Sequence, residues 1–127
     1  MTNHSDSEIA TELIGYHRMA LDRDNVLRRQ GAEWAPATLI DLAYDDPARC
    51  WRIIKLAALQ NPDNEALMFF GVTLSGLLRE NSELIKAIAC DVEQDHRLRE
   101  VMSWIMKDDE IDRSVWARVV SLSGPTK

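Results

Sequence analysis

Glycine and proline are scarce in this sequence, with 5 and 4 among its 127 residues. An all-β sandwich or barrel needs many turn residues, so this scarcity favours helices. Apolar residues recur every three to four positions along most of the chain, and no stretch alternates with a period of two for long enough to predict a strand. The sequence therefore predicts an all-α fold.

Long apolar runs and cysteines are scarce as well. The longest apolar-rich stretch, residues 67–78, is shorter than the roughly 20 residues that a membrane-spanning helix requires. The first eight residues are polar, so we expect no signal peptide. Cys50 and Cys90 lie in apolar surroundings, and we expect both to be reduced core residues. These features predict a cytoplasmic protein without membrane association.

Familiar catalytic and metal-binding motifs are also missing. The sequence contains no G-x-S-x-G, no glycine-rich phosphate loop and no paired Cys/His spacing. The acidic stretch 108–112 lacks the glycine and the terminal glutamate of a calcium loop. Ser75 stands in an apolar helical segment, where we interpret it as a packing residue. We therefore expect no enzyme, no cofactor and no metal site.

Helix-start signals, by contrast, are frequent. Ser5 and Glu8 have the spacing of a capping box. Asp45-Asp46-Pro47 precedes an apolar stripe, and we interpret it as a helix cap followed by a first-turn proline rather than as part of a catalytic site. Further helix starts are predicted at residues 61–63, 81–82, 95 and 112–114. The whole chain, 1–127, is predicted to form one domain of six to eight short helices, packed as antiparallel pairs in a small α-solenoid-like (HEAT-like) arrangement.

The segment after residue 63 is apolar nearly all round, which predicts a buried helix. Gly71 and Ser75 lie one turn apart in it, so either a neighbouring helix approaches closely there or Gly71 divides the segment into two short helices. Trp51 and Trp116 lie on apolar stripes and are predicted to be core residues. Trp104 lies off its stripe, which makes it the candidate interface anchor among the tryptophans.

Several short motifs occur in an order that resembles an uncharacterised bacterial family of small helical domains of unknown function. They are Trp34-Ala35, Leu39-x-x-Leu42, Asp46-Pro47-x-x-x-Trp51-x-x-Ile54, Leu74-x-x-Leu77-Leu78 and Val115-Trp116-x-Arg118-Val119. The resemblance covers about residues 34–120 and implies a helical bacterial protein, with no activity to carry over. That family has an acidic pair inside its Leu-x-x-Leu-Leu motif, where this chain has Ser75 and Gly76.

Negative charge is concentrated in one part of the chain. The net charge is −6, and residues 80–112 alone carry 10 acidic and 4 basic side chains. Such a segment repels nucleic acid and membrane phosphates and attracts basic proteins. The small basic patch of Arg23, Arg28 and Arg29 is interleaved with Asp22 and Asp24, so it does not predict direct nucleic-acid binding either.

These features favour a non-enzymatic protein-binding module that presents an acidic helical surface to a basic protein partner. An immunity protein or an inhibitor of a nuclease-type toxin is one concrete form, because a basic toxin would be steered onto an acidic surface. The residues expected to contact the partner are Asp91, Glu93, Asp95, Trp104, Asp108, Asp109 and Glu110. Two alternatives stay open: a phage-encoded, anti-CRISPR-like inhibitor whose acids mimic phosphates toward a nucleic-acid-binding defence complex, and a homo-oligomeric scaffold with a homodimer seam near residues 68–70.

Overall fold

A computed structural model describes residues 5–19, 34–60 and 62–123 of the chain. Its helices are α1 (Asp6–Met19), α3 (Trp34–Asp45), α4 (Pro47–Ala58), α5 (Asn64–Glu80), α6 (Ile85–Gln94), α7 (Arg99–Ser103) and α8 (Arg113–Leu122). Two short 3₁₀ turns, η2 (Ser82–Leu84) and η3 (His96–Leu98), lead into α6 and α7. The predicted all-α class is confirmed within these residues. The basic patch around Arg28 lies outside them.

Local side-chain bonds explain where several helices begin. The Ser5 hydroxyl accepts a hydrogen bond from the Glu8 amide at 3.1 Å. The Asp46 carboxylate accepts one from the Arg49 amide at 3.2 Å, and Pro47 is the first residue of α4. Asp-Asp-Pro is therefore a helix cap, as its sequence predicts, because these side chains satisfy amides that have no partner inside the helix. In the same way, the Asp95 side chain caps η3 and the Asp112 side chain caps α8.

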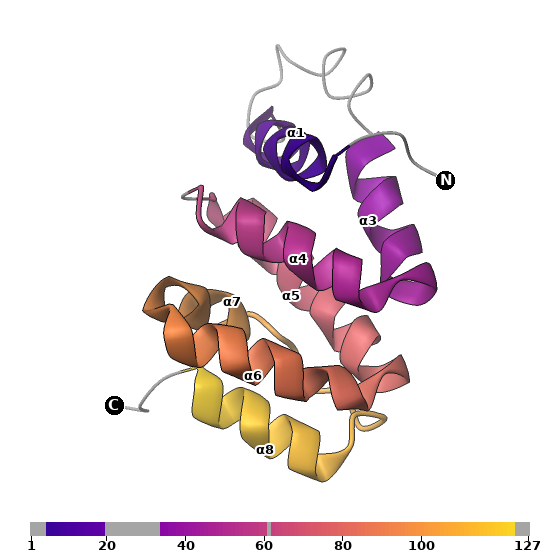
Figure 1. The fold of residues 1–127 in the computed structure, drawn as a ribbon, viewed down its shortest axis with the longest axis vertical. Helices are drawn as coiled ribbons and strands as arrows, with labels where there is room; N and C mark the ends of the chain where they lie inside the picture. Colours follow the sequence, from indigo (N-terminus) through magenta and orange to yellow (C-terminus); the bar gives the residue numbers. More distant parts are fainter. Residues whose placement is uncertain (1–4, 20–33, 61, 124–127) are drawn as a thin grey trace.

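Helix α5 is the central element of the fold (Figure 1). It contacts α1, α3 and α4 in one half of the molecule and α7 in the other, while α6 and α8 pack together. Nine of its 17 residues are buried, which confirms the buried helix predicted there. One cluster of buried apolar side chains continues from α1 to α8. None of the described helices combines the length and apolar character that crossing a membrane requires.

The solenoid arrangement is not confirmed. In a solenoid each repeat contacts only its neighbours in the stack. Here α1 packs against α3, α4 and α5 together, which makes a small bundle at that end of the molecule. What the structure does show is that residues 5–19, 34–60 and 62–123 fold entirely as helices and the segments that join them.

Gly71 and Ser75 join α5 to the chain that follows α7. Helix α5 continues through Gly71, and an added Cβ there would lie only 2.1 Å from the Trp104 carbonyl oxygen. Gly71 therefore does not divide the helix, and the close approach is correct, although the approaching backbone is that of Trp104, the residue directly after α7. One turn on, the Ser75 hydroxyl lies 3.0 Å from the Gly71 carbonyl and 3.1 Å from the Met106 carbonyl, and it accepts the Met106 amide at 3.0 Å. These contacts hold the segment after α7 against α5.

The tryptophan predictions are mostly correct, whereas one cysteine prediction is wrong. Trp51 is buried, Trp104 is partly exposed as predicted, and Trp116 is only half-buried against the core. Cys50 is buried, but Cys90 is exposed. Position 90 lies between the buried Ala89 and the partly exposed Asp91, beside the α6 stripe of Ile88, Ala89 and Val92, so its thiol faces solvent.

Candidate functional site

The residues expected to contact a partner lie in two places. Asp91, Glu93 and Asp95 belong to α6 and its C-terminal end, whereas Trp104, Asp108, Asp109 and Glu110 belong to the segment between α7 and α8. The two groups have different surroundings, and these decide which carboxylates are available to a partner.

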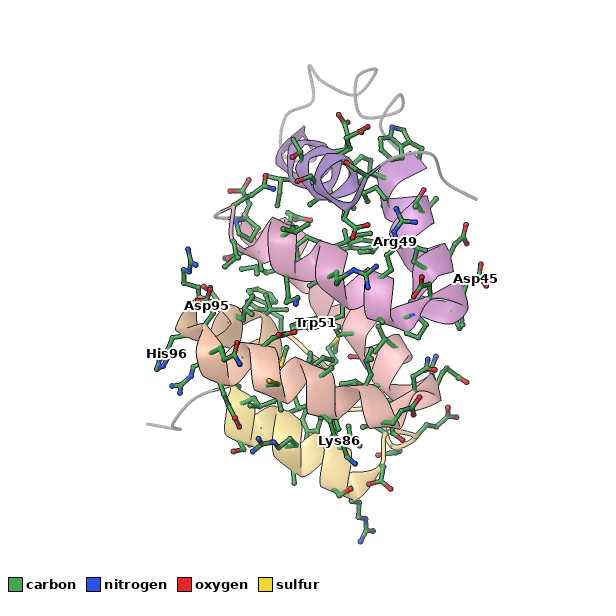
Figure 2. All side chains as sticks on the ribbon, in the orientation of Figure 1. Asp45, Arg49, Trp51, Lys86, Asp95 and His96 are labelled. Atoms are coloured by element: carbon green, nitrogen blue, oxygen red, sulfur yellow. The ribbon has the colours of Figure 1, made fainter. Side chains whose placement is uncertain are left out.

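Asp91 joins α6 to α4. Its carboxylate accepts a hydrogen bond from the Trp51 indole at 2.7 Å and lies 2.9 Å from the Lys55 ammonium; Figure 2 shows Trp51 between the two helices. Partial burial raises the pKa of Asp91, but the bonds from Lys55 and Trp51 and the charge of Lys55 outweigh it, so the pKa lies below its ordinary value. Asp91 is therefore engaged within the fold.

The other two acids of α6 also have internal partners. Glu93 forms an ion pair with Arg118 of α8. Asp95 caps η3 and binds the Arg97 guanidinium at 3.0 and 2.8 Å, and the Arg97 side-chain and amide bonds lower the pKa of Asp95. Asp95 lies with His96 at the outer end of α6 (Figure 2). The three acids of α6 and its C-terminal end thus contact four partners, Trp51, Lys55, Arg118 and Arg97.

The acids after α7 gather around one arginine. The Arg79 guanidinium lies 3.0 Å from Asp108, 3.6 Å from Glu110 and 3.5 Å from Glu80. We call these four residues the Arg79 cluster; it has three carboxylates and one cation, a net charge of −2. The Glu110 amide at 2.9 Å lowers the pKa of Asp108, and the Arg79 bond adds to this against the opposing effect of burial. The lowered pKa keeps Asp108 ionised at neutral pH.

Asp109 has a different environment from its neighbours. It is exposed, and it makes no hydrogen bond or ion pair with the part of the chain that the structure describes. Its charge adds to that of the Arg79 cluster, whereas Lys107 brings one compensating cation. The segment 107–110 together with Arg79 and Glu80 therefore keeps a net charge of −2 toward solvent.

An apolar pocket opens beside this cluster. It has a volume of about 400 Å³ and lies between α3, α5 and the segment after α7. We call it the α3–α5 pocket. Its apolar lining is made by Ile40, Ala43, Tyr44, Phe69, Val72 and Met106, and its polar lining by Thr73, Ser75, Gly76, Arg79, Lys107 and Asp108. Apolar and ionised groups thus meet at its Asp108 end.

Two of the three hydroxyl groups of the pocket, those of Thr73 and Ser75, are engaged by backbone carbonyls, whereas the exposed Tyr44 makes no hydrogen bond with a described residue. Thr73 donates to the Phe69 carbonyl at 2.9 Å, and Ser75 binds Gly71 and Met106 as described above. The arrangement therefore offers an apolar hollow next to ionised carboxylates, which suits association with apolar and basic side chains. Among the described residues, no three His, Cys, Asp or Glu side chains are grouped so as to hold a metal ion.

Sequence reasoning missed the residues that make this site. Arg79 and Glu80 end α5, and their link to Asp108 depends on how the chain returns after α7. Ile40 and Tyr44 offered a weak signal, because they lie four residues apart on α3, off the stripe of Leu39 and Ala43 that faces the core. A second apolar line on a short helix indicates a second contact surface.

No family model, curated protein or solved structure gives a significant match to this chain. The family resemblance of residues 34–120 therefore stays a prediction.

Proposed function

We propose that this chain is a non-enzymatic protein-binding module that captures a basic protein partner, such as a nuclease-type toxin that it would inhibit as an immunity protein. The observation that carries the proposal is the Arg79 cluster, in which three carboxylates share one guanidinium. Asp109 extends this negative surface and has no hydrogen-bond or ion-pair partner within residues 5–19, 34–60 and 62–123.

Electrostatics give such a surface a role in association. A net negative patch raises the rate at which a basic protein encounters it, and the effect weakens with salt. A nuclease carries basic side chains because it must bind phosphates. Acids placed over that surface would compete with the nucleic acid.

The contacts within the fold reduce the number of predicted residues that are available to bind a partner directly. Asp91, Glu93 and Asp95 are paired within the fold, so they contribute mainly to its stability and to the long-range field. Trp104 packs against the core and against Gly71. Asp108 and Glu110 are paired too, but they share the single Arg79 guanidinium with Glu80, so the cluster keeps an excess of negative charge. The direct contacts are therefore assigned to Asp109, which makes no hydrogen bond or ion pair with a described residue, and to Asp108 and Glu110 beside it.

A pull-down from the lysate of the native host tests this proposal. The tagged chain is compared with the variant D109K/E110K at about 50 mM and about 500 mM salt. The matched control is E12K/D45K, which makes the same change of net charge at two exposed acids outside residues 80–112. We expect a basic protein to be captured at low salt by the wild type and the control, to be released at high salt, and to be lost with D109K/E110K. Capture that D109K/E110K leaves intact would contradict the proposal.

The phage-encoded inhibitor is a variant of the same idea, because it would use the same acids against a nucleic-acid-binding complex. The identity of the captured protein separates the two forms. A toxin with nuclease activity supports the immunity role, and a subunit of a nucleic-acid-binding defence complex supports the phosphate-mimicking role.

A homo-oligomeric scaffold is the second candidate function. It is favoured by exposed apolar side chains on α3 and α5, namely Ile40, Tyr44, Met68 and Val72. Phe70 cannot contribute to such a seam, because it is fully buried. Light scattering at micromolar concentration tests this candidate: a dimer that persists at high salt would support it, and a monomer would remove it.

A further inference from the structure

The α3–α5 pocket has an apolar lining that the fold leaves open to solvent. The side chains of Ile40, Tyr44, Val72 and Met106 are between 46% and 63% exposed. Its volume of about 400 Å³ lies within the range of ligand-binding pockets, roughly 300–1,000 Å³. Large apolar side chains grouped around one hollow typically mark a surface of interaction.

The inner surface of the pocket is held rigidly. Ser75 binds both the amide and the carbonyl of Met106, and the chain at Trp104 lies against Gly71 without room for a side chain between them. Because the hydroxyls of Thr73 and Ser75 bind backbone carbonyls, the α5 wall of the pocket offers few unused polar groups. An apolar side chain therefore suits its interior better than a polar ligand does.

The charge at one end of the pocket determines whether a cation or an anion can lie beside that apolar side chain. Asp108 lines the pocket and belongs to the Arg79 cluster, and Glu110 and Asp109 lie next to it. A cation placed there would be attracted by the excess of carboxylates, whereas an anion would be repelled. Two cations, Arg79 and Lys107, also line the pocket and compensate part of this charge. With Glu80, Asp109 and Glu110 beside Asp108, the group still carries a net charge of −2.

We propose that the α3–α5 pocket binds a segment of the basic partner in which an apolar side chain lies within a few residues of a lysine or arginine. The apolar side chain occupies the hollow lined by Ile40, Val72 and Met106. The cation contacts Asp108, Asp109 and Glu110. This inference rests on the protein-binding function proposed above and names the feature of the partner that the module recognises.

A second copy of this chain is a poorer occupant. Two copies that packed pocket to pocket would bring two Arg79 clusters, each with a net charge of −2, into the same interface. Like charges that face each other across an interface cost free energy. The charge at the pocket therefore favours a basic partner over self-association.

The test uses random peptides of about twelve residues displayed on phage and selected on the full-length wild-type chain. The enriched peptides are then synthesised, and their affinities are measured by fluorescence anisotropy for the wild type and three variants. V72E places a charge in the pocket, and D109K/E110K reverses the charge at its end. V120E is the matched control, because Val120 is exposed to a similar degree, 45% against 52% for Val72, and lies on α8 away from the pocket. Circular dichroism checks that each variant is folded.

We expect enriched peptides that combine an apolar residue with a nearby Lys or Arg. V72E and D109K/E110K should each weaken their binding by at least about tenfold, and V120E should leave it within about twofold. The affinity should also fall between about 50 mM and about 500 mM salt.

Other outcomes would overturn the inference. Basic peptides without an apolar residue, bound equally by the wild type and V72E but lost with D109K/E110K, would refute the role of the pocket and leave the proposed function standing. Apolar peptides insensitive to D109K/E110K would refute the role of the cation. Absence of enrichment, or a wild-type dimer that V72E dissociates, would also refute it. The pull-down described above decides the proposed function separately.

Discussion

Replacing Gly71 by alanine tests the contact that holds the segment after α7 against α5. The Cβ added at this position would lie 2.1 Å from the Trp104 carbonyl oxygen and 2.5 Å from its carbonyl carbon. Ordinary van der Waals contact begins at 3.4 Å, so the carbonyl oxygen would have to move by about 1.3 Å. Both contact atoms belong to the backbone, and Met106 nearby is bound to Ser75, so this movement would strain the whole segment.

The size of the effect follows from two opposing contributions. Alanine in a helix is about 1 kcal/mol more favourable than glycine. Overpacking costs about 1–3 kcal/mol, and each hydrogen bond of Ser75 that the displaced segment loses costs about 0.5–1.5 kcal/mol more. We expect G71A to lower the free energy of unfolding by about 2–3 kcal/mol. For a domain of this size, that corresponds to a fall in Tm of about 8–12 °C.

Two other glycines provide matched controls. A Cβ on Gly15 of α1 would meet nothing within 4 Å, and one on Gly76 of α5 would lie 3.9 Å from the nearest atom, in the Arg79 guanidinium. G15A and G76A should therefore each stabilise the protein by about 0.5–1 kcal/mol. Urea unfolding followed by circular dichroism measures all three variants, with equal m-values as the check that only stability has changed. If G71A proved as stable as G15A, the close packing of Gly71 against Trp104 would be refuted.

Three further predictions concern side chains with internal partners. S75A should lower the free energy of unfolding by about 1–3 kcal/mol, because it leaves the Met106 amide without its acceptor; urea unfolding measures this, and an unchanged midpoint would contradict it. The lowered pKa of Asp91 means that its ionised form is favoured in the folded state, so the stability it contributes is present above about pH 4 and is lost as the pH falls through the folded-state pKa. The unfolding free energy of D91N should therefore depend less on pH below about 4 than that of the wild type, and equal pH dependence would contradict this. Burial raises the pKa of the Cys50 thiol to about 12, whereas Cys90 is exposed. A thiol reagent at about pH 8 should modify only Cys90 rapidly in the folded protein and both cysteines in denaturant, and rapid modification of Cys50 in the folded protein would contradict this.

Features that depend on neighbouring residues could be predicted from the sequence. Ser5 and Asp46 cap helices because their acceptor oxygens need to reach amides only three residues away. The apolar stripe of α5 predicted a buried helix because burial follows the 3.6-residue period. Cys90 shows where this reasoning fails, because an apolar neighbourhood in sequence does not tell which face of α6 meets the core.

The candidate site depends on contacts between distant residues. Composition identified residues 80–112 as acidic, but it could not tell which acids are engaged within the fold and which face a partner. Asp91 binds Lys55 and Trp51, whereas Asp109 makes no hydrogen bond or ion pair with a described residue. This difference depends on how α4 packs on α6, at a separation of about 40 residues along the chain.

By itself, then, the sequence determined the helical class, the capped helix starts, the buried course of α5 and the excess of negative charge, since each depends on local periodicity or composition. Only the tertiary structure decided that Arg79 gathers Glu80, Asp108 and Glu110 beside an apolar pocket. The physical reason is that the chain after α7 runs back against α5, which no local pattern in the sequence specifies. Gly71 admits the Trp104 backbone, Ser75 binds Met106 at a separation of 31 residues, and these contacts place the acids of that segment at the end of α5.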